Sequence, residues 1–275
     1  MEKVKLIVDS SANEQASDKL TVVPLTITIA GQDFIDNETL DMETFISNMN
    51  KNTEEGKTSC PSINDWLEAL EGSTKAIMLT ITSGLSGSFS SAYQAKQIYE
   101  KDHPGSSVIV VDSRTAGPEV AMIQHKIEHL AESQVRFLDL EQKIAKYKTH
   151  THLLFILQSL HNLALNGRVN MAVAKVAKML KIDLVGTASE EGKLEPISKV
   201  RGMKRALGEV IKLMTEMKYQ GGRVIIDHCK NEKDANILKD KIIALYPDAN
   251  IVIRPMMGLC AFYGEEESLM IGFEG

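Results

Sequence analysis

The sequence predicts an α/β fold in two domains: an N-terminal parallel α/β domain over residues 1–150 and a C-terminal α+β domain with a mixed sheet over residues 151–275. In the first half, apolar runs repeatedly end in a hydroxyl or Asp-Ser loop that opens a helix, which is typical of a parallel sheet. In the second half, a hairpin signal breaks this rhythm. No long Gly/Ser linker separates the halves, so we expect them to pack closely.

The first half alternates strands with helices. Runs of apolar and β-branched residues predict strands at Val4–Val8, Leu20–Ala30, Ala76–Ile81 and Val108–Val111. Pro24 places the second of these at a sheet edge, and the turn at Gly31–Asp33 indicates a further short strand after it. Helices are expected at Asp41–Met49, Ser62–Leu70 and Ser91–Glu100, and two more between Val120 and Lys148, broken near Ser133–Phe137.

The second half mixes hairpin and crossover connections. Asp183–Ser189 and Lys193–Val200 flank Glu190-Glu191-Gly192, which predicts a hairpin, and Pro196 puts the second strand at an edge. Further strands are expected at His152–Leu157, Arg223–Asp227, Asn250–Arg254 and Ser268–Phe273. Helices are expected at Ala172–Leu180, Gly202–Met217 and Asp234–Leu245.

Composition and charge exclude several classes of protein. An apolar content of 43% argues against general disorder, and a net charge of −6 gives no overall electrostatic reason to bind nucleic acid. Cys60, Cys229 and Cys260 lie far apart and form no CxxC pair, which indicates neither a disulfide framework nor a zinc cage. With no signal-peptide pattern and no apolar run of roughly 18 residues, we expect a cytoplasmic protein without a membrane span.

The common catalytic motifs are missing. There is no phosphate-binding GxxxxGK[ST] loop and no HExxH. His150 and His152 share one face of a strand, where a strand end beside solvent explains them better than a metal. The stretch Gly84-Leu85-Ser86-Gly87 has its second glycine one residue too early for a nucleophile elbow, so hydrolase chemistry has little support.

Two hydroxyl-rich segments are the strongest candidates for a ligand site. In Thr82–Ser88, between a buried strand and a helix, glycines such as Gly87 let backbone amides approach an anion, and Ser83 and Ser86 add neutral donors. Helix capping and a tight turn would explain the same pattern. Lys57–Ser62 also opens a helix, and capping by its last serine is again an alternative. Together the segments predict hydroxyl donors that converge at the edge of an open sheet.

Two basic segments are further candidates for a binding site. They are Asn166-Gly167-Arg168-Val169 and the run from Lys199 to Arg205. The second opens a helix, where the dipole disfavours cations, which indicates a carboxylate, a phosphate or an acidic partner. A solvated basic face is the alternative.

These segments, in this order, resemble the DegV family of bacterial fatty-acid-binding proteins, as do Val8-Asp9-Ser10-Ser11 and Val111-Asp112-Ser113. The resemblance implies two α/β-type domains with a long-chain fatty acid between or beside them. It also implies that the carboxylate is presented to a separate fatty acid kinase, which makes acyl-phosphate for phospholipid synthesis. By this resemblance the chain is not an enzyme, has no catalytic residues and needs no cofactor beyond the bound fatty acid.

The resemblance implies that Thr58, with Ser59 adjacent, and Ser86 hold the carboxylate, and Ser83 and Gly87 lie in the same loop as Ser86. From their charge, Arg168, Arg201 and Lys204 are expected to dock the kinase.

One position departs from the family pattern. Cys260 stands roughly where the family has a histidine that contacts the carboxylate, and Glu265–Glu267 follow soon after. A thiol is a weak donor and carries no positive charge. We therefore expect a head group held by one partner fewer, or a different native ligand.

Two other functions stay open from the sequence. One is an enzyme acting on an acyl or phosphate ester through Ser83–Ser88, and the other is a partner-binding module that has lost lipid binding. Burial of about fifteen methylenes at ~0.8 kcal/mol each supplies on the order of 10 kcal/mol before ordering costs, which favours the lipid carrier.

Overall fold

The computed structural model describes residues 4–52, 56–133, 135–170 and 182–275. A four-stranded sheet, sheet A, is parallel throughout, in the order β2-β1-β6-β7. Its strands are β1 (Lys5–Asp9), β2 (Leu20–Val23), β6 (Lys75–Thr80) and β7 (Ser107–Asp112). This sheet confirms the parallel α/β prediction for the first half, with β2 at an edge.

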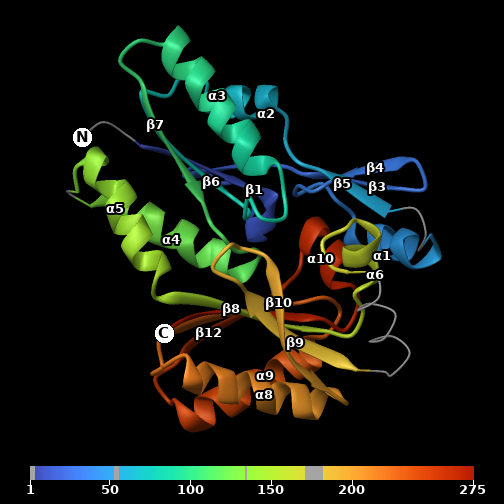
Figure 1. Cartoon of the computed structure of the whole chain (residues 1–275). Helices are drawn as coiled ribbons and strands as arrows, with labels where there is room; N and C mark the ends of the chain where they lie inside the picture. The colour runs from blue at the N-terminus through green and yellow to red at the C-terminus, as the bar shows by residue number, and fades with distance from the viewer. Residues whose placement is uncertain (1–3, 53–55, 134, 171–181) are drawn as a thin grey trace.

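Helices cover both faces of sheet A (Figure 1). One face packs against α2 (Ile63–Leu70) and α3 (Ser88–Asp102), and the other against α4 (Pro118–Glu132) and α5 (Phe137–Lys148). The four central residues of β6, Ala76–Leu79, are all apolar and buried, as this two-sided burial requires.

The second half forms a six-stranded mixed sheet, sheet C, in the order β10-β9-β8-β13-β11-β12. Its strands are β8 (Thr151–Leu157), β9 (Asp183–Ala188), β10 (Leu194–Val200), β11 (Arg223–His228), β12 (Asn250–Pro255) and β13 (Leu269–Glu274). All neighbours are antiparallel except β11 and β12. The hairpin β9–β10 and its edge strand with Pro196 are as predicted.

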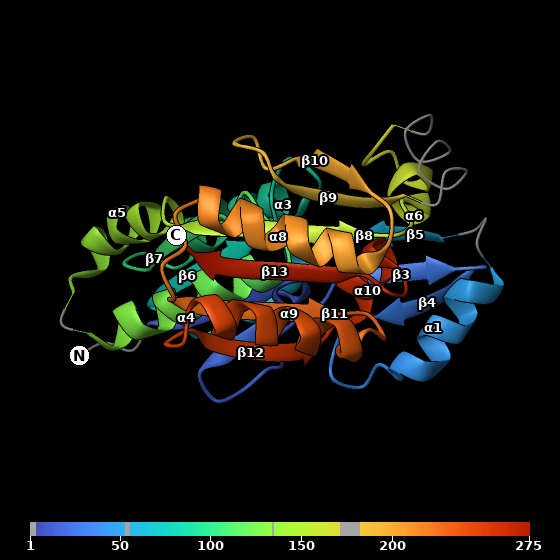
Figure 2. The same ribbon diagram turned by 90° about the horizontal axis from the view of Figure 1, so that it is seen from below.

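Sheet C lies between two helical layers. Figure 2 shows α8 (Met203–Glu216) and α9 (Glu232–Leu245) side by side across its outer face. On the inner face α4 packs against β8, β11 and β13, and the same helix contacts β1 and β6 of sheet A. A domain boundary near residue 150 stays a prediction, because α4 is shared between the two sheets.

A third sheet was not predicted as such. The expected single strand Leu20–Ala30 is wrong: it divides into β2 and β3 (Thr26–Ile29), which belong to different sheets. Pro24 lacks an N–H for ladder pairing, and the Leu25 N–H donates to Ser10 Oγ at 3.1 Å where the chain leaves sheet A. In sheet B, β3 pairs antiparallel with β4 (Gln32–Ile35) and with β5 (Gly56–Ser59).

Three helices pack near sheet B: α1 (Met42–Lys51), α6 (His161–Leu165) and α10 (Gly258–Gly264). The first turn of α10 is held by Asp36, whose Oδ2 accepts from the Leu259 N–H at 3.1 Å. A Cβ on Gly258 would lie 2.7 Å from Asp36 Oδ1, so this close approach requires glycine. Burial raises the pKa of Asp36 to about 6.

The other predicted helices and strands of the described residues are present, with ends displaced by a few residues. The helix expected at Ala172–Leu180 lies outside the described residues. Within the described ranges, no helix is both long and apolar enough to cross a membrane.

Candidate functional site

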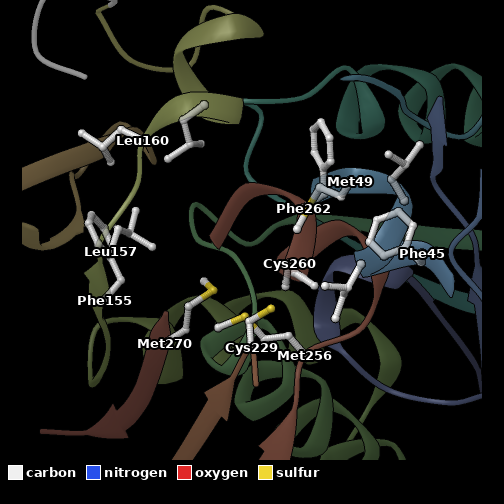
Figure 3. Close-up of a cluster of buried hydrophobic side chains, with 14 of the residues drawn as sticks. Phe45, Met49, Phe155, Leu157, Leu160, Cys229, Met256, Cys260, Phe262 and Met270 are labelled. Carbon is white, nitrogen blue, oxygen red and sulfur yellow. The ribbon is translucent and has the colours of Figure 1, made fainter. Parts of the chain in front are cut away.

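An apolar cavity lies where loops of sheet A meet β5, β8 and α10. It encloses about 670 Å³ of space outside the protein atoms, part of it open to solvent. Most of its lining is apolar, from Leu25, Ile81, Leu85, Ala116, Phe155, Leu157, Leu163, Leu194, Leu259 and Met270. Figure 3 shows four of the lining residues, Phe155, Leu157, Cys260 and Met270, within a cluster of buried hydrophobic side chains. A predominantly apolar lining with a few polar side chains suits an apolar small molecule that carries a polar group.

Four polar side chains interrupt this lining: Thr58, Ser86, Tyr263 and Arg168. Thr58 lies on β5, where side chains alternate between faces, so it is half-buried and the adjacent Ser59 is exposed. Thr58 Oγ1 lies 2.7 Å from the Tyr263 hydroxyl oxygen. Of the two neighbouring hydroxyls expected at the carboxylate, Thr58 lines the cavity and Ser59 does not.

The loop before α3 brings only one of its predicted residues to the cavity. Ser86 lines it, and its Oγ accepts from the Ser88 N–H at 3.2 Å, which leaves the Ser86 proton free to donate. Ser83 instead donates to Asp112 Oδ2 at 2.6 Å. Gly87 is the residue before α3 and is exposed, and a Cβ there would lie 3.2 Å from Cys60 Sγ.

The buried Asp9 at the end of β1 fixes this loop. Its Oδ2 accepts from the Ile81 N–H at 2.9 Å and from Ser88 Oγ at 2.6 Å, and its Oδ1 accepts from Ser11. Burial raises the pKa of Asp9, and these donors offset part of that rise. In the sequence, this role is indicated only by the Asp9-Ser10-Ser11 step after the first strand, and Asp9 was not predicted as a site residue.

Arg168 is the one charged side chain among the described residues that line the cavity. It is half-buried, donates to the backbone oxygen of Asn166 and holds its Cζ 5.7 Å from the centre of the Tyr263 ring. It also lines a second, more polar cavity with Gly84, Asn166 and Lys193. Arg168 therefore lies where the apolar cavity meets a polar opening.

Cys260 lines the cavity but directs its thiol toward the backbone. Its Sγ lies 3.5 Å from the Ser11 carbonyl oxygen, to which it donates. Burial raises the pKa of Cys260 well above its usual value, so the group stays an uncharged thiol. Arg201 and Lys204 lie apart from both cavities, exposed beside the first turn of α8. Their role in docking a partner stays a prediction.

Tyr263 was missed by the sequence reasoning. Its place on α10, one turn after Cys260, gives it the same helix face. The segment shows no strong periodic pattern, so the only signal was that it follows the departure at Cys260.

The family model described as "Uncharacterised protein, DegV family" matches residues 3–274. The chain belongs to the DegV family. A DegV domain-containing protein of Streptococcus pneumoniae is 39% identical over 252 residues, which are 92% of this chain and 90% of that protein. One from Streptococcus gordonii is 37% identical with the same coverage.

Solved DegV structures superpose closely on this chain. The fatty acid kinase (Fak) B3 protein of Streptococcus pneumoniae, loaded with linoleic acid, has a TM-score of 0.96 and 38% identity, with 100% of this chain and 99% of that chain covered. A DegV family protein of Eubacterium eligens, loaded with heptadecanoic acid, has a TM-score of 0.95 and 34% identity, with 98% and 99% covered. The mixed α/β architecture is thus that of the DegV structures.

Proposed function

We propose that this DegV protein binds a long-chain fatty acid, with its acyl chain in the apolar cavity and its carboxylate at Thr58, Ser86 and Arg168. The observation that carries the proposal is a cavity lined by apolar side chains apart from a few hydroxyls, one thiol and one guanidinium. A buried carboxylate is costly unless donors meet it, and these residues supply both neutral donors and a cation. The ligands of the two similar structures support the same class of molecule.

The energies are consistent with a carrier. A long acyl chain gains about 0.8 kcal/mol for each buried methylene, before ordering costs. Hydrogen bonds to the charged head group add roughly 1.5–3 kcal/mol each. Chain burial therefore supplies most of the affinity, and the polar residues orient the ligand.

We further propose that the bound carboxylate is presented to a separate fatty acid kinase. Arg168 borders both cavities, so a head group beside it would face the polar opening. The exposed Arg201 and Lys204 would attract an acidic surface of the partner. The name of the similar Streptococcus pneumoniae protein points to the same partner class.

The ester-enzyme alternative has no such support. It requires a His or carboxylate beside Ser86, whereas the hydrogen bond of Ser86 Oγ within the described residues is with the Ser88 N–H. That partner cannot act as a base.

Native mass spectrometry of protein purified without added lipid tests the binding proposal, followed by titration with a fluorescent fatty acid. We expect a bound mass in the fatty-acid range and saturable binding. Arg168→Gln should weaken binding of the acid about tenfold or more, because one charge-assisted contact is lost. The control Arg136→Gln alters an exposed arginine paired with Asp139 and should leave binding unchanged. A protein that carries no lipid and binds none would overturn the proposal.

A further inference from the structure

The helix that carries Cys260 offers a different donor to the cavity. The thiol of Cys260 is engaged with the Ser11 carbonyl oxygen, 3.5 Å away, so it is not directed at a ligand. Tyr263, three residues later on α10, also lines the cavity, and its hydroxyl oxygen lies 2.7 Å from Thr58 Oγ1. The hydrogen-bond donor that α10 supplies to this cavity is therefore the phenol hydroxyl of Tyr263.

The contact between Tyr263 and Thr58 leaves one hydroxyl proton for a further hydrogen bond. Each hydroxyl has one proton, and one of the two protons is used in the bond between them. Whichever residue donates, one O–H remains for a third group. Because hydrogen bonds in a chain polarise one another, that remaining proton is a stronger donor than an isolated hydroxyl. The pair is thus a single neutral donor built from two elements, β5 and α10.

Tyr263 also contacts the cation of the site. The Arg168 Cζ lies 5.7 Å from the centre of the Tyr263 ring, within the range of a cation–π interaction. The hydrogen bond of Arg168 within the described residues goes to the backbone oxygen of Asn166 and not to a carboxylate. The ring therefore contacts the Arg168 guanidinium next to the hydroxyl pair.

We propose that Tyr263 is a head-group residue of this chain: with Thr58 it donates one hydrogen bond to the ligand carboxylate, and its ring orients Arg168 toward the same anion. This inference rests on the proposed function and adds specificity to it. A carboxylate accepts a charge-assisted hydrogen bond from the hydroxyl pair and also pairs with Arg168. A neutral ester of the same chain length accepts only a weaker hydrogen bond from the pair and lacks the charge for Arg168. Tyr263 would thus favour the free acid over its esters.

A conservative substitution separates the hydroxyl from the ring. Tyr263→Phe removes one oxygen and keeps the ring beside Arg168, and Thr58→Val removes the other hydroxyl. The probes are 11-(dansylamino)undecanoic acid and its methyl ester, titrated by fluorescence. We expect Tyr263→Phe to weaken binding of the acid about tenfold or more, and binding of the ester less than about twofold. The double variant should bind the acid at least as weakly as the more affected single variant, because each single variant leaves one hydroxyl proton and the double variant leaves none.

The control is Tyr93→Phe, which alters an exposed tyrosine on α3 and should change neither affinity. If Tyr263→Phe binds the acid as tightly as the wild type, or loses acid and ester equally, the inference is wrong and the proposed function stands. If the wild type binds neither probe, the proposed function fails and the inference fails with it. If Tyr263→Phe does not fold, Thr58→Val decides. Because Thr58 then no longer polarises the Tyr263 hydroxyl, unchanged affinity for the acid overturns the hydroxyl pair.

Discussion

Asp36 is a carboxyl group with no exposed surface that accepts from the first turn of α10. Burial raises its pKa from 3.8 to about 6 in the folded protein. Between these two values the folded chain holds a proton that the unfolded chain has lost. The stabilisation by this group is therefore fully present below about pH 4 and is lost as the pH rises through 6.

Asp36→Asn should remove this dependence. The free energy of unfolding of the wild type should fall relative to that of the variant by up to about 3 kcal/mol between pH 4 and 7. Urea unfolding at several pH values measures the difference. The exposed Asp240→Asn is the control, and it should keep the wild-type slope. Equal slopes in all three proteins would contradict the role of Asp36.

Part of the candidate site could be predicted from the sequence, residue by residue. The sequence indicated Thr58, Ser86 and Cys260 as ligand residues and Arg168 as a docking residue, and all four line the cavity. The sequence could not show that Thr58 faces the cavity and Ser59 faces solvent. That difference follows from the alternation of side chains along β5, and the polar sequence of β5 does not predict a strand. The sequence also could not show that the hydroxyl of Ser83 donates to Asp112, which lies at the end of β7 and distant in the chain.

At the scale of elements, two glycines in helices have opposite surroundings. A Cβ on Gly258 in α10 would lie 2.7 Å from both Asp36 Oδ1 and Leu40 Cδ2. A Cβ on Gly208 in α8 would meet nothing within 4 Å. Alanine is the better helix former wherever space allows.

Gly258→Ala should therefore lower the free energy of unfolding by about 1–3 kcal/mol, and it should weaken fatty acid binding because α10 lines the cavity. Gly208→Ala should raise stability by about 0.5–1 kcal/mol and leave binding unchanged. Thermal melts and the fluorescent titration compare the two variants. A Gly258→Ala protein as stable as the wild type would show that α10 can shift away from Asp36 without cost.

The elements of sheets A and C followed from apolar runs and turn signals, so most could be predicted. Sheet B could not, because β3 continues directly from an apolar run and β5 has no apolar pattern of its own. The helix α10 was missed for a related reason: its first turn is fixed by Asp36, far away in the sequence, and not by a local capping residue.

At the scale of the whole molecule, a buried ionic network joins the two halves. Arg254 on β12 donates from Nε to Asp227 Oδ1 at 2.8 Å, and it also pairs with Glu14. Asn13, just after β1, donates to Asp227 Oδ2 at 2.8 Å and accepts from the Met257 N–H. The segment after β1 is thereby fixed to the edge of sheet C that leads into α10.

Arg254→Met should destabilise the protein by about 3–5 kcal/mol, because it leaves Asp227 buried without its cation. Urea unfolding measures the loss, and the exposed Arg136→Met serves as the control. Adding Asp227→Asn should recover part of the stability. A single variant as stable as the wild type would show that water or a rearranged side chain replaces Arg254.

The order of strands in sheet C has a consequence for biosynthesis. The strand β13 lies between β8 and β11, yet it follows both of them in the chain. Until it leaves the ribosome, β8 and β11 present unpaired edges, and the face of sheet C that packs on α4 is incomplete. Such long-range pairing is slow, and exposed edges invite association with other chains. We therefore expect a nascent chain stalled before β13 to be prone to aggregation and to need protection by chaperones.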